Sequence, residues 1–96
     1  MLQDSTVPEI NFVAPETQTE KQLAAIWSQL LDIERVGRND TFMSVGGESI
    51  LATQCVNRIH AAFGVDIPVD TLFFDEATLI ELARMIDDQR RVPPVI

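Results

Sequence analysis

The sequence contains few of the residues that form disulfides, metal sites or membrane spans. It has one cysteine and one histidine, so it can form no internal disulfide and offers too few ligands for a zinc site. No apolar run approaches the roughly 18 residues that a membrane-spanning helix requires. The first residues include an early acid and lack the basic start and apolar block of a secretory signal. We therefore expect a cytoplasmic protein that does not contact a membrane.

Basic residues are also scarce. Seven lysines and arginines stand against fifteen aspartates and glutamates, which gives a net charge of -8. This charge repels phosphate backbones, so nucleic acids are poor partners, whereas it favours basic protein surfaces or serves only solubility. The chain has 96 residues, enough for one domain with a modest core and too few to enclose a deep catalytic cavity. We expect a monomeric domain.

Metal binding and catalysis find no support in the remaining polar residues. Residues 32–43 begin like a calcium-binding loop, but Val36 and Met43 stand where oxygen ligands belong. Cys55 and His60 lie five residues apart in an expected helix. That spacing separates them by roughly 140° around the helix axis, so they cannot act as a nucleophile and its base. We expect neither a metal site nor catalytic residues.

The spacing of apolar residues predicts helices. A first helix begins at a capping box formed by Thr19 and Gln22 and carries an apolar stripe as far as Leu31. A second helix spans residues 49–63, and Gly64 is a typical left-handed stop.

Two further starts follow from local signals. Pro68 begins a short helix, and Thr78 with Glu81 forms a capping box that begins the last one. Within the long first loop, residues 32–48, Asp40 is placed to cap a single turn.

The expected fold is all-α, a bundle of three main helices plus one or two short helices, because no segment shows the alternation of a strand. Residues 17–90 form the folded domain in this interpretation. Residues 1–16 and 91–96 carry prolines and are expected to be an N-terminal arm and a C-terminal linker.

A glycine pair and a serine stand directly before the second predicted helix. Serine at a helix start is a common N-cap, so Ser49 can be a purely structural residue preceded by a turn at Gly46 and Gly47. Alternatively, the glycines leave its hydroxyl open to another enzyme, and the helix N-terminus favours a phosphate. Ile50 lies off the core stripe, which fits either a docking position or an isolated surface isoleucine.

The motifs in this order resemble the peptidyl carrier (thiolation) domains of nonribosomal peptide synthetases, members of the phosphopantetheine-binding, acyl-carrier-like family. The resemblance covers about residues 13–90. It rests on "VAP" before the first helix, then "IW..LL.IERVG", "D.F...GG.S", "RI...FGV.IP", "LF" and "AT...LA". It implies a helical bundle in which Ser49 carries 4′-phosphopantetheine, added from coenzyme A by a phosphopantetheinyl transferase. The thiol of this arm would hold an aminoacyl or peptidyl thioester, and the domain itself would catalyse nothing.

The resemblance also implies partners. Adenylation and condensation domains are expected, with epimerisation or thioesterase domains as further candidates. Met43 and Ile50 match apolar positions that contact partners, and Phe74 completes the expected docking set. The family commonly has His before the modified serine, or Asp in carriers that feed epimerisation domains. Glu48 is acidic at that position, which favours the epimerisation type.

Two other functions remain open. Acyl carriers of polyketide or fatty-acid assembly are also helical and acidic, but their motif typically reads Asp-Ser-Leu where this chain has "GGESI". An unmodified helical interaction module would use Met43, Ile50 and Phe74 as an apolar patch and would bind equally well after Ser49→Ala.

Overall fold

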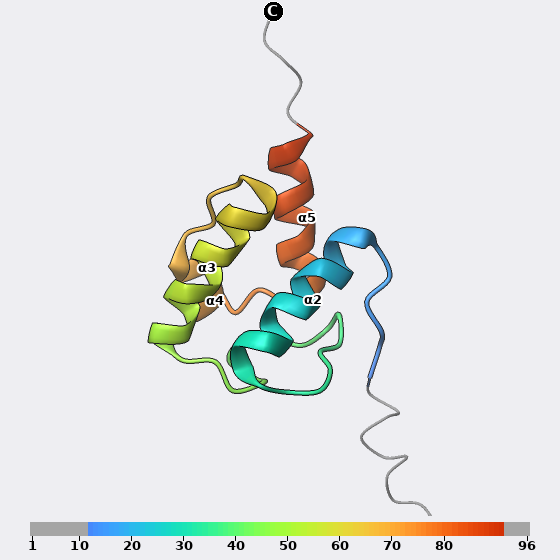
Figure 1. Ribbon diagram of the computed structural model, residues 1–96, viewed down its shortest axis with the longest axis vertical. Helices are drawn as coiled ribbons and strands as arrows, with labels where there is room; N and C mark the ends of the chain where they lie inside the picture. The colour runs from blue at the N-terminus through green and yellow to red at the C-terminus, as the bar shows by residue number, and fades with distance from the viewer. Residues whose placement is uncertain (1–11, 92–96) are drawn as a thin grey trace, which may run out of the picture.

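The computed structural model describes residues 12–91, and that part of the chain contains four helices (Figure 1). They are α2 (Gln18–Leu31), α3 (Ser49–Phe63), α4 (Val69–Phe73) and α5 (Leu79–Arg90). Between residues 12 and 91, β pairing is limited to one isolated bridge from Thr41 to Thr78. The predicted all-α bundle of three main helices and a short one is therefore confirmed. Most of the two expected linkers lies outside the described residues.

Helix α2 lies between α3 and α5 and packs against both, while α4 packs on α3 (Figure 1). At the centre, the rings of Trp27 and Phe42 meet edge to face, with centroids 5.3 Å apart. Both side chains are fully buried. The core draws on every described helix and on the loops: Leu23, Trp27, Val36, Phe42, Ala52, Cys55, Ile59, Phe63, Val65, Ile67, Leu72, Leu79, Leu82, Ala83 and Ile86.

The start of α2 differs from the sequence prediction. The N-cap is Thr17, whose hydroxyl accepts a hydrogen bond from the backbone N–H of Glu20 at 3.1 Å. The predicted capping box of Thr19 and Gln22 is therefore wrong. Thr19 lies inside the helix, and its hydroxyl donates to Asp87 of α5 at 2.6 Å. Thr17 is followed three residues later by Glu20, and Thr19 by Gln22, so the sequence offers two overlapping capping patterns. In the structure Thr19 bonds Asp87 of α5 instead, and Thr17 is the cap.

The other three helix limits agree with the prediction. Gly64 ends α3 with φ of 74°, in the left-handed region that glycine adopts most readily. Pro68 is the N-cap of α4. Thr78 and Glu81 form the complete capping box of α5, each side chain accepting from the other residue's backbone N–H. These positions were predictable because each depends on residues close together in the sequence.

Arg38 joins the first loop to three other parts of the molecule. Its N–H donates to the carbonyl of Val13 at 2.8 Å, and its carbonyl accepts from Ile80 of α5 at 3.0 Å. Its guanidinium donates to both carboxylate oxygens of Glu20, at 3.0 and 2.8 Å. Glu20 is only 2% exposed, so this is a buried, bidentate ion pair. The loop is thus held against α2, α5 and the segment before α2.

The turn inside the loop is capped differently from the prediction. Asp40 does not cap the following residues, because its carboxylate accepts from the N–H of Gly37 at 2.9 Å. Thr41 and Ser44 make the turn instead. The hydroxyl of each accepts from the other's backbone N–H, both at 3.0 Å. The predicted role of Asp40 is therefore wrong, and the hydroxyl groups of these two residues form the turn.

Candidate functional site

Ser49 is the first residue of α3 and is exposed. The N-cap is Glu48, in extended conformation, and its side chain makes no capping hydrogen bond. Ser49 is therefore not the N-cap, and the capping role that the sequence suggested for it is wrong. Within residues 12–91 no group hydrogen-bonds its hydroxyl oxygen; only its backbone carbonyl has a side-chain partner, Thr53. The hydroxyl is therefore exposed and has no partner among these residues.

The two glycines before Ser49 have different roles. Gly46 has φ of 106°, and an added Cβ would meet nothing within 4 Å, so only its backbone conformation requires glycine. Gly47 is needed for space. An added Cβ there would lie 2.7 Å from the carbonyl oxygen of Phe42 and closer still to its ring. The N–H of Gly47 also donates to that carbonyl at 2.9 Å. The chain thus passes tightly over Phe42 before it reaches Ser49.

The start of α3 provides a favourable setting for an anion. No acid occurs in its first turn, the one nearby carboxylate being that of Glu48 at the N-cap, and no side chain caps the helix. The first N–H groups of a helix have no partner inside the helix, and they carry the positive end of its dipole. A phosphate attached to the Ser49 hydroxyl would lie near these groups. The residues present therefore fit a phosphodiester at this position.

Two of the three expected docking residues are well exposed. Ile50, next to Ser49, is 67% exposed, and Phe74, the C-cap of α4, is 74% exposed. The ring of Phe74 packs edge to face on Phe73, with centroids 5.5 Å apart. Met43 is only half-buried, in the loop before the glycines. These three apolar residues thus belong to the first loop, α3 and the end of α4.

Cys55 and His60 play no part in this site. Cys55 is fully buried, and burial raises the pKa of its thiol to about 12, so it stays protonated at neutral pH. His60 is exposed, and its Nδ1 lies 2.9 Å from a carboxylate oxygen of Asp66. The two side chains therefore do not form a nucleophile pair.

Among residues 12–91, no three histidine, cysteine or acidic side chains gather as a metal site would need. The same residues include no helix long and apolar enough to cross a membrane.

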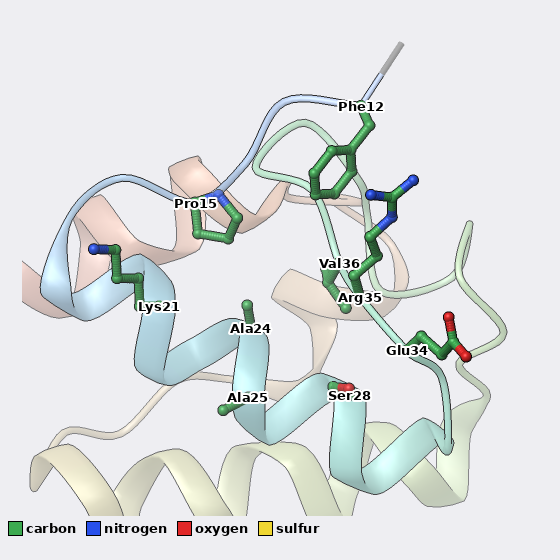
Figure 2. Close-up of a pocket in the computed structure, with 9 residues that line it drawn as sticks. All are labelled: Phe12, Pro15, Lys21, Ala24, Ala25, Ser28, Glu34, Arg35 and Val36. Atoms are coloured by element: carbon green, nitrogen blue, oxygen red, sulfur yellow. The ribbon is translucent and has the colours of Figure 1, made fainter. Parts of the chain in front are cut away.

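A pocket of about 260 Å³ lies on the face of α2 turned away from α3 (Figure 2). The segment before α2, α2 itself and residues 34–36 form its wall: Phe12, Pro15, Lys21, Ala24, Ala25, Ser28, Glu34, Arg35 and Val36. Ligand pockets usually start at about 300 Å³, and neither residues 46–49 nor the expected docking residues line this one. The pocket is therefore separate from the site at Ser49.

The contact between Phe42 and Gly47 and the ion pair between Glu20 and Arg38 were not predicted from the sequence. The ion pair joins residues 18 apart in the sequence, and no residue type near Phe42 and Gly47 marks the wide, five-residue turn that joins them. The only sequence signal for the first was a second glycine that no turn required.

Comparison with known proteins places these features in a family. Residues 21–86 match the family model described as "Phosphopantetheine attachment site". One of the linear gramicidin synthase proteins of Brevibacillus parabrevis is 56% identical over 62 residues, which cover 65% of this chain and 1% of that protein. Malpinin synthetase of Mortierella alpina is 44% identical over 85 residues, which cover 86% of this chain and 1% of that protein. The chain thus spans a very small part of these relatives.

Solved structures agree with the sequence match. The solution structure of an active-site mutant peptidyl carrier protein superimposes with a TM-score of 0.82 at 28% identity, covering 94% of this chain and 99% of the other. A peptidyl carrier protein in complex with the phosphopantetheine transferase Sfp and coenzyme A gives a TM-score of 0.76 at 30% identity, covering 80% and 99%. The chain therefore belongs to the phosphopantetheine-attachment family, as a non-catalytic carrier domain of the peptidyl type found in nonribosomal peptide synthetases, with 4′-phosphopantetheine as its covalent cofactor.

Proposed function

We propose that Ser49 is the attachment residue, and that the domain holds an aminoacyl or peptidyl group as a thioester during nonribosomal peptide assembly. The observation that carries this proposal is the exposed hydroxyl of Ser49, which has no hydrogen-bond partner in residues 12–91 and stands at an uncapped helix start. A serine that served the fold would use its oxygen as a cap. This one keeps its oxygen available within the segment that matches the family.

Loading of the domain is a transfer from coenzyme A. The Ser49 oxygen forms a bond to the pantetheine-bearing phosphorus of the pyrophosphate, and the bond from that phosphorus to adenosine 3′,5′-bisphosphate breaks. The hydroxyl proton must go to a base on the transferase, because the described part of this chain places no acceptor on the Ser49 oxygen. The thiol of the attached arm then supplies the position for the acyl group.

The apolar side chains around Ser49 are the proposed docking surface. Met43, Ile50 and Phe74 would contact the phosphopantetheinyl transferase and the adenylation and condensation domains. Exposed apolar side chains on a small acidic domain fit such transient contacts. We also propose that residues 17–90 form the carrier domain, that 1–16 and 91–96 are linkers to neighbouring domains, and that it works in the cytoplasm.

Glu48 is the proposed determinant of the downstream partner. It is exposed, its side chain makes no capping bond, and it directly precedes Ser49, so a partner reaching the arm would meet its charge. We expect Glu48→His to lower acyl transfer to an epimerisation domain several-fold relative to a condensation domain. Transfer rates from loaded carriers to both domains measure this, and equal changes for the two partners would remove Glu48 from the proposal.

Intact-protein mass tests the attachment site. The 96-residue chain is incubated with coenzyme A and a promiscuous phosphopantetheinyl transferase, beside Ser49→Ala. We expect the mass of one phosphopantetheine to be added to the wild type and nothing to be added to the variant. Ser44→Ala is the matched control, since it removes a serine of the same loop that already has hydrogen-bond partners.

The other outcomes are decisive as well. Modification of Ser49→Ala would place the arm on another residue. A folded wild type that gains no mass would favour the unmodified interaction module, and binding to partners would then survive Ser49→Ala. Acceptance of the loaded chain by an acyl-assembly domain, with none by condensation domains, would favour the polyketide or fatty-acid carrier.

A further inference from the structure

We propose that Phe42 is a positioning residue for the reaction at Ser49, acting through Gly47. This inference rests on the proposed attachment at Ser49 and adds a cause for the direction in which the hydroxyl points. Phe42 is fully buried, so it cannot touch the transferase or coenzyme A. Its influence on the reaction must pass through the backbone between residues 42 and 49.

Phe42 is held from two sides. Its ring packs edge to face on Trp27 of α2, with an angle of 76° between the ring planes. The residue before it, Thr41, forms the isolated bridge with Thr78 at the start of α5. The carbonyl of Asp40 accepts from Leu79 at 2.9 Å. Phe42 therefore has a position that is fixed by two helices packed on each other.

The chain returns from Phe42 to Ser49 through Gly47. The N–H of Gly47 donates to the Phe42 carbonyl, and Gly47 sits so close to the ring that no Cβ would fit. Ser49 follows two residues later, and its helix start has no side-chain cap to fix it. The closed turn over Phe42 therefore sets the path of the backbone before Glu48, where the bonds of α3 begin with Ala52 donating to the Glu48 carbonyl at 2.7 Å.

The expected effect is on the rate of transfer more than on binding. A nucleophile displaced by about 1 Å can lose up to about a hundredfold in rate, because the attacking oxygen must line up with the phosphorus. Of the proposed docking residues, Ile50 lies in α3 and Phe74 is the C-cap of α4, outside the turn, whereas Met43 lies within it. Loss of the Phe42 ring should therefore lower kcat for the carrier as substrate by a larger factor than it raises KM.

The test uses two variants of the full chain, each measured alone and in combination. Phe42→Leu removes the ring, and Gly47→Ala adds the Cβ that the ring excludes. Transfer from saturating coenzyme A is followed at varied carrier concentration by release of adenosine 3′,5′-bisphosphate. We expect each single variant to lose about tenfold in kcat. The double variant should lose less in kcat than the two single losses multiplied together, because both changes act on the same turn, although the Phe42 carbonyl oxygen, 2.7 Å from the added Cβ, stays in place.

Ile86→Val is the matched control, since Ile86 is fully buried in α5 and lies outside the loop. Stability is compared by thermal unfolding. The proposal is overturned if Ile86→Val, or a second α5 core variant with the same melting temperature, loses as much kcat as Phe42→Leu. It is also overturned if the two variants of the turn combine additively. Should Phe42→Leu lose its helical spectrum, Gly47→Ala decides alone, because it removes no core side chain and displaces only the Phe42 ring and carbonyl that contact Gly47. A wild type that gains no phosphopantetheine would contradict the attachment proposal instead.

Discussion

The starts of α5 and α3 differ in whether their first backbone N–H groups have hydrogen-bond partners. Helix α5 begins after Thr78, whose side chain accepts from Glu81, while carbonyls of Asp40 and Arg38 accept from Leu79 and Ile80. Every early N–H of α5 therefore has a partner. Helix α3 begins after Glu48, which provides no side-chain cap. Within residues 12–91 its first N–H groups have no comparable partner.

The difference separates a structural helix start from a functional one. Unsatisfied N–H groups at a helix start cost stability unless water or a ligand satisfies them. At α5 the carbonyls of Asp40 and Arg38 in the first loop accept from the N–H groups of Leu79 and Ile80, so these groups do not lower stability. The same hydrogen bonds hold the loop against α5. At α3 the groups stay available for the phosphate proposed at Ser49. The loop thus has one closed end, at residues 38–41, and one open end, at residues 48–49 where α3 starts.

The largest expected effect comes from breaking the closed end. Glu20 holds Arg38 by two hydrogen bonds, and Arg38 in turn accepts from α5. We expect Glu20→Gln to lower the free energy of unfolding by about 2 kcal/mol, the usual loss for hydrogen bonds between charged groups. Chemical denaturation measures it. Attachment to Ser49 should persist in the folded fraction, since the open end does not use this pair.

The pH dependence of stability gives the same pair a second signature. Burial acts to raise the pKa of Glu20, but the hydrogen bond from Arg38, the backbone N–H groups of Glu16 and Thr17 and the charge of Arg38 together lower it. The folded state therefore favours the ionised carboxylate. This contribution is fully present above the ordinary glutamate pKa and is lost as the pH falls through the lower value of the folded state. Glu20→Gln should be less sensitive to acid over that range, and an unchanged sensitivity would contradict the role of the pair.

The sequence predicted the parts of the fold that depend on neighbouring residues. The limits of α3, the glycine after it and the capping box at Thr78 follow from signals within a few positions. The start of α2 was misplaced because Thr17 and Thr19 both fit a cap, and the deciding partner of Thr19 is Asp87 of α5. A single sequence does not show which distant side chain will be beside a given hydroxyl.

In the candidate site, too, features that depend on neighbouring residues were predictable and features that depend on distant residues were not. Ser49 and the two glycines were identified from the motif, and Ile50 was placed off the core stripe correctly. What Gly47 does was not predictable, because its constraint comes from the ring of Phe42, which depends on how α2 packs. Arg38 counted in the sequence only as one basic residue among seven, since its partners come from α2, α5 and Val13.

The smallest expected effects come from the two hydroxyl residues at the helix starts, taken as a matched pair. Thr78→Ala removes a cap that accepts a hydrogen bond, so we expect it to lower the free energy of unfolding by about 1 kcal/mol. Ser49→Ala removes a hydroxyl that bonds nothing in the described chain. Alanine also has the higher helix propensity, so this variant should change stability by only about 0.3 kcal/mol or less.

Urea unfolding measures the loss of stability in each variant, which should be larger for Thr78→Ala. In the modification assay, the larger loss should instead be that of Ser49→Ala. Thr78→Ala should still accept phosphopantetheine, whereas Ser49→Ala should not. A loss of stability in Ser49→Ala equal to that in Thr78→Ala would mean that Ser49 also caps its helix in solution. The open start of α3 would then be closed like that of α5, and the hydroxyl would have to leave a hydrogen bond before it could react.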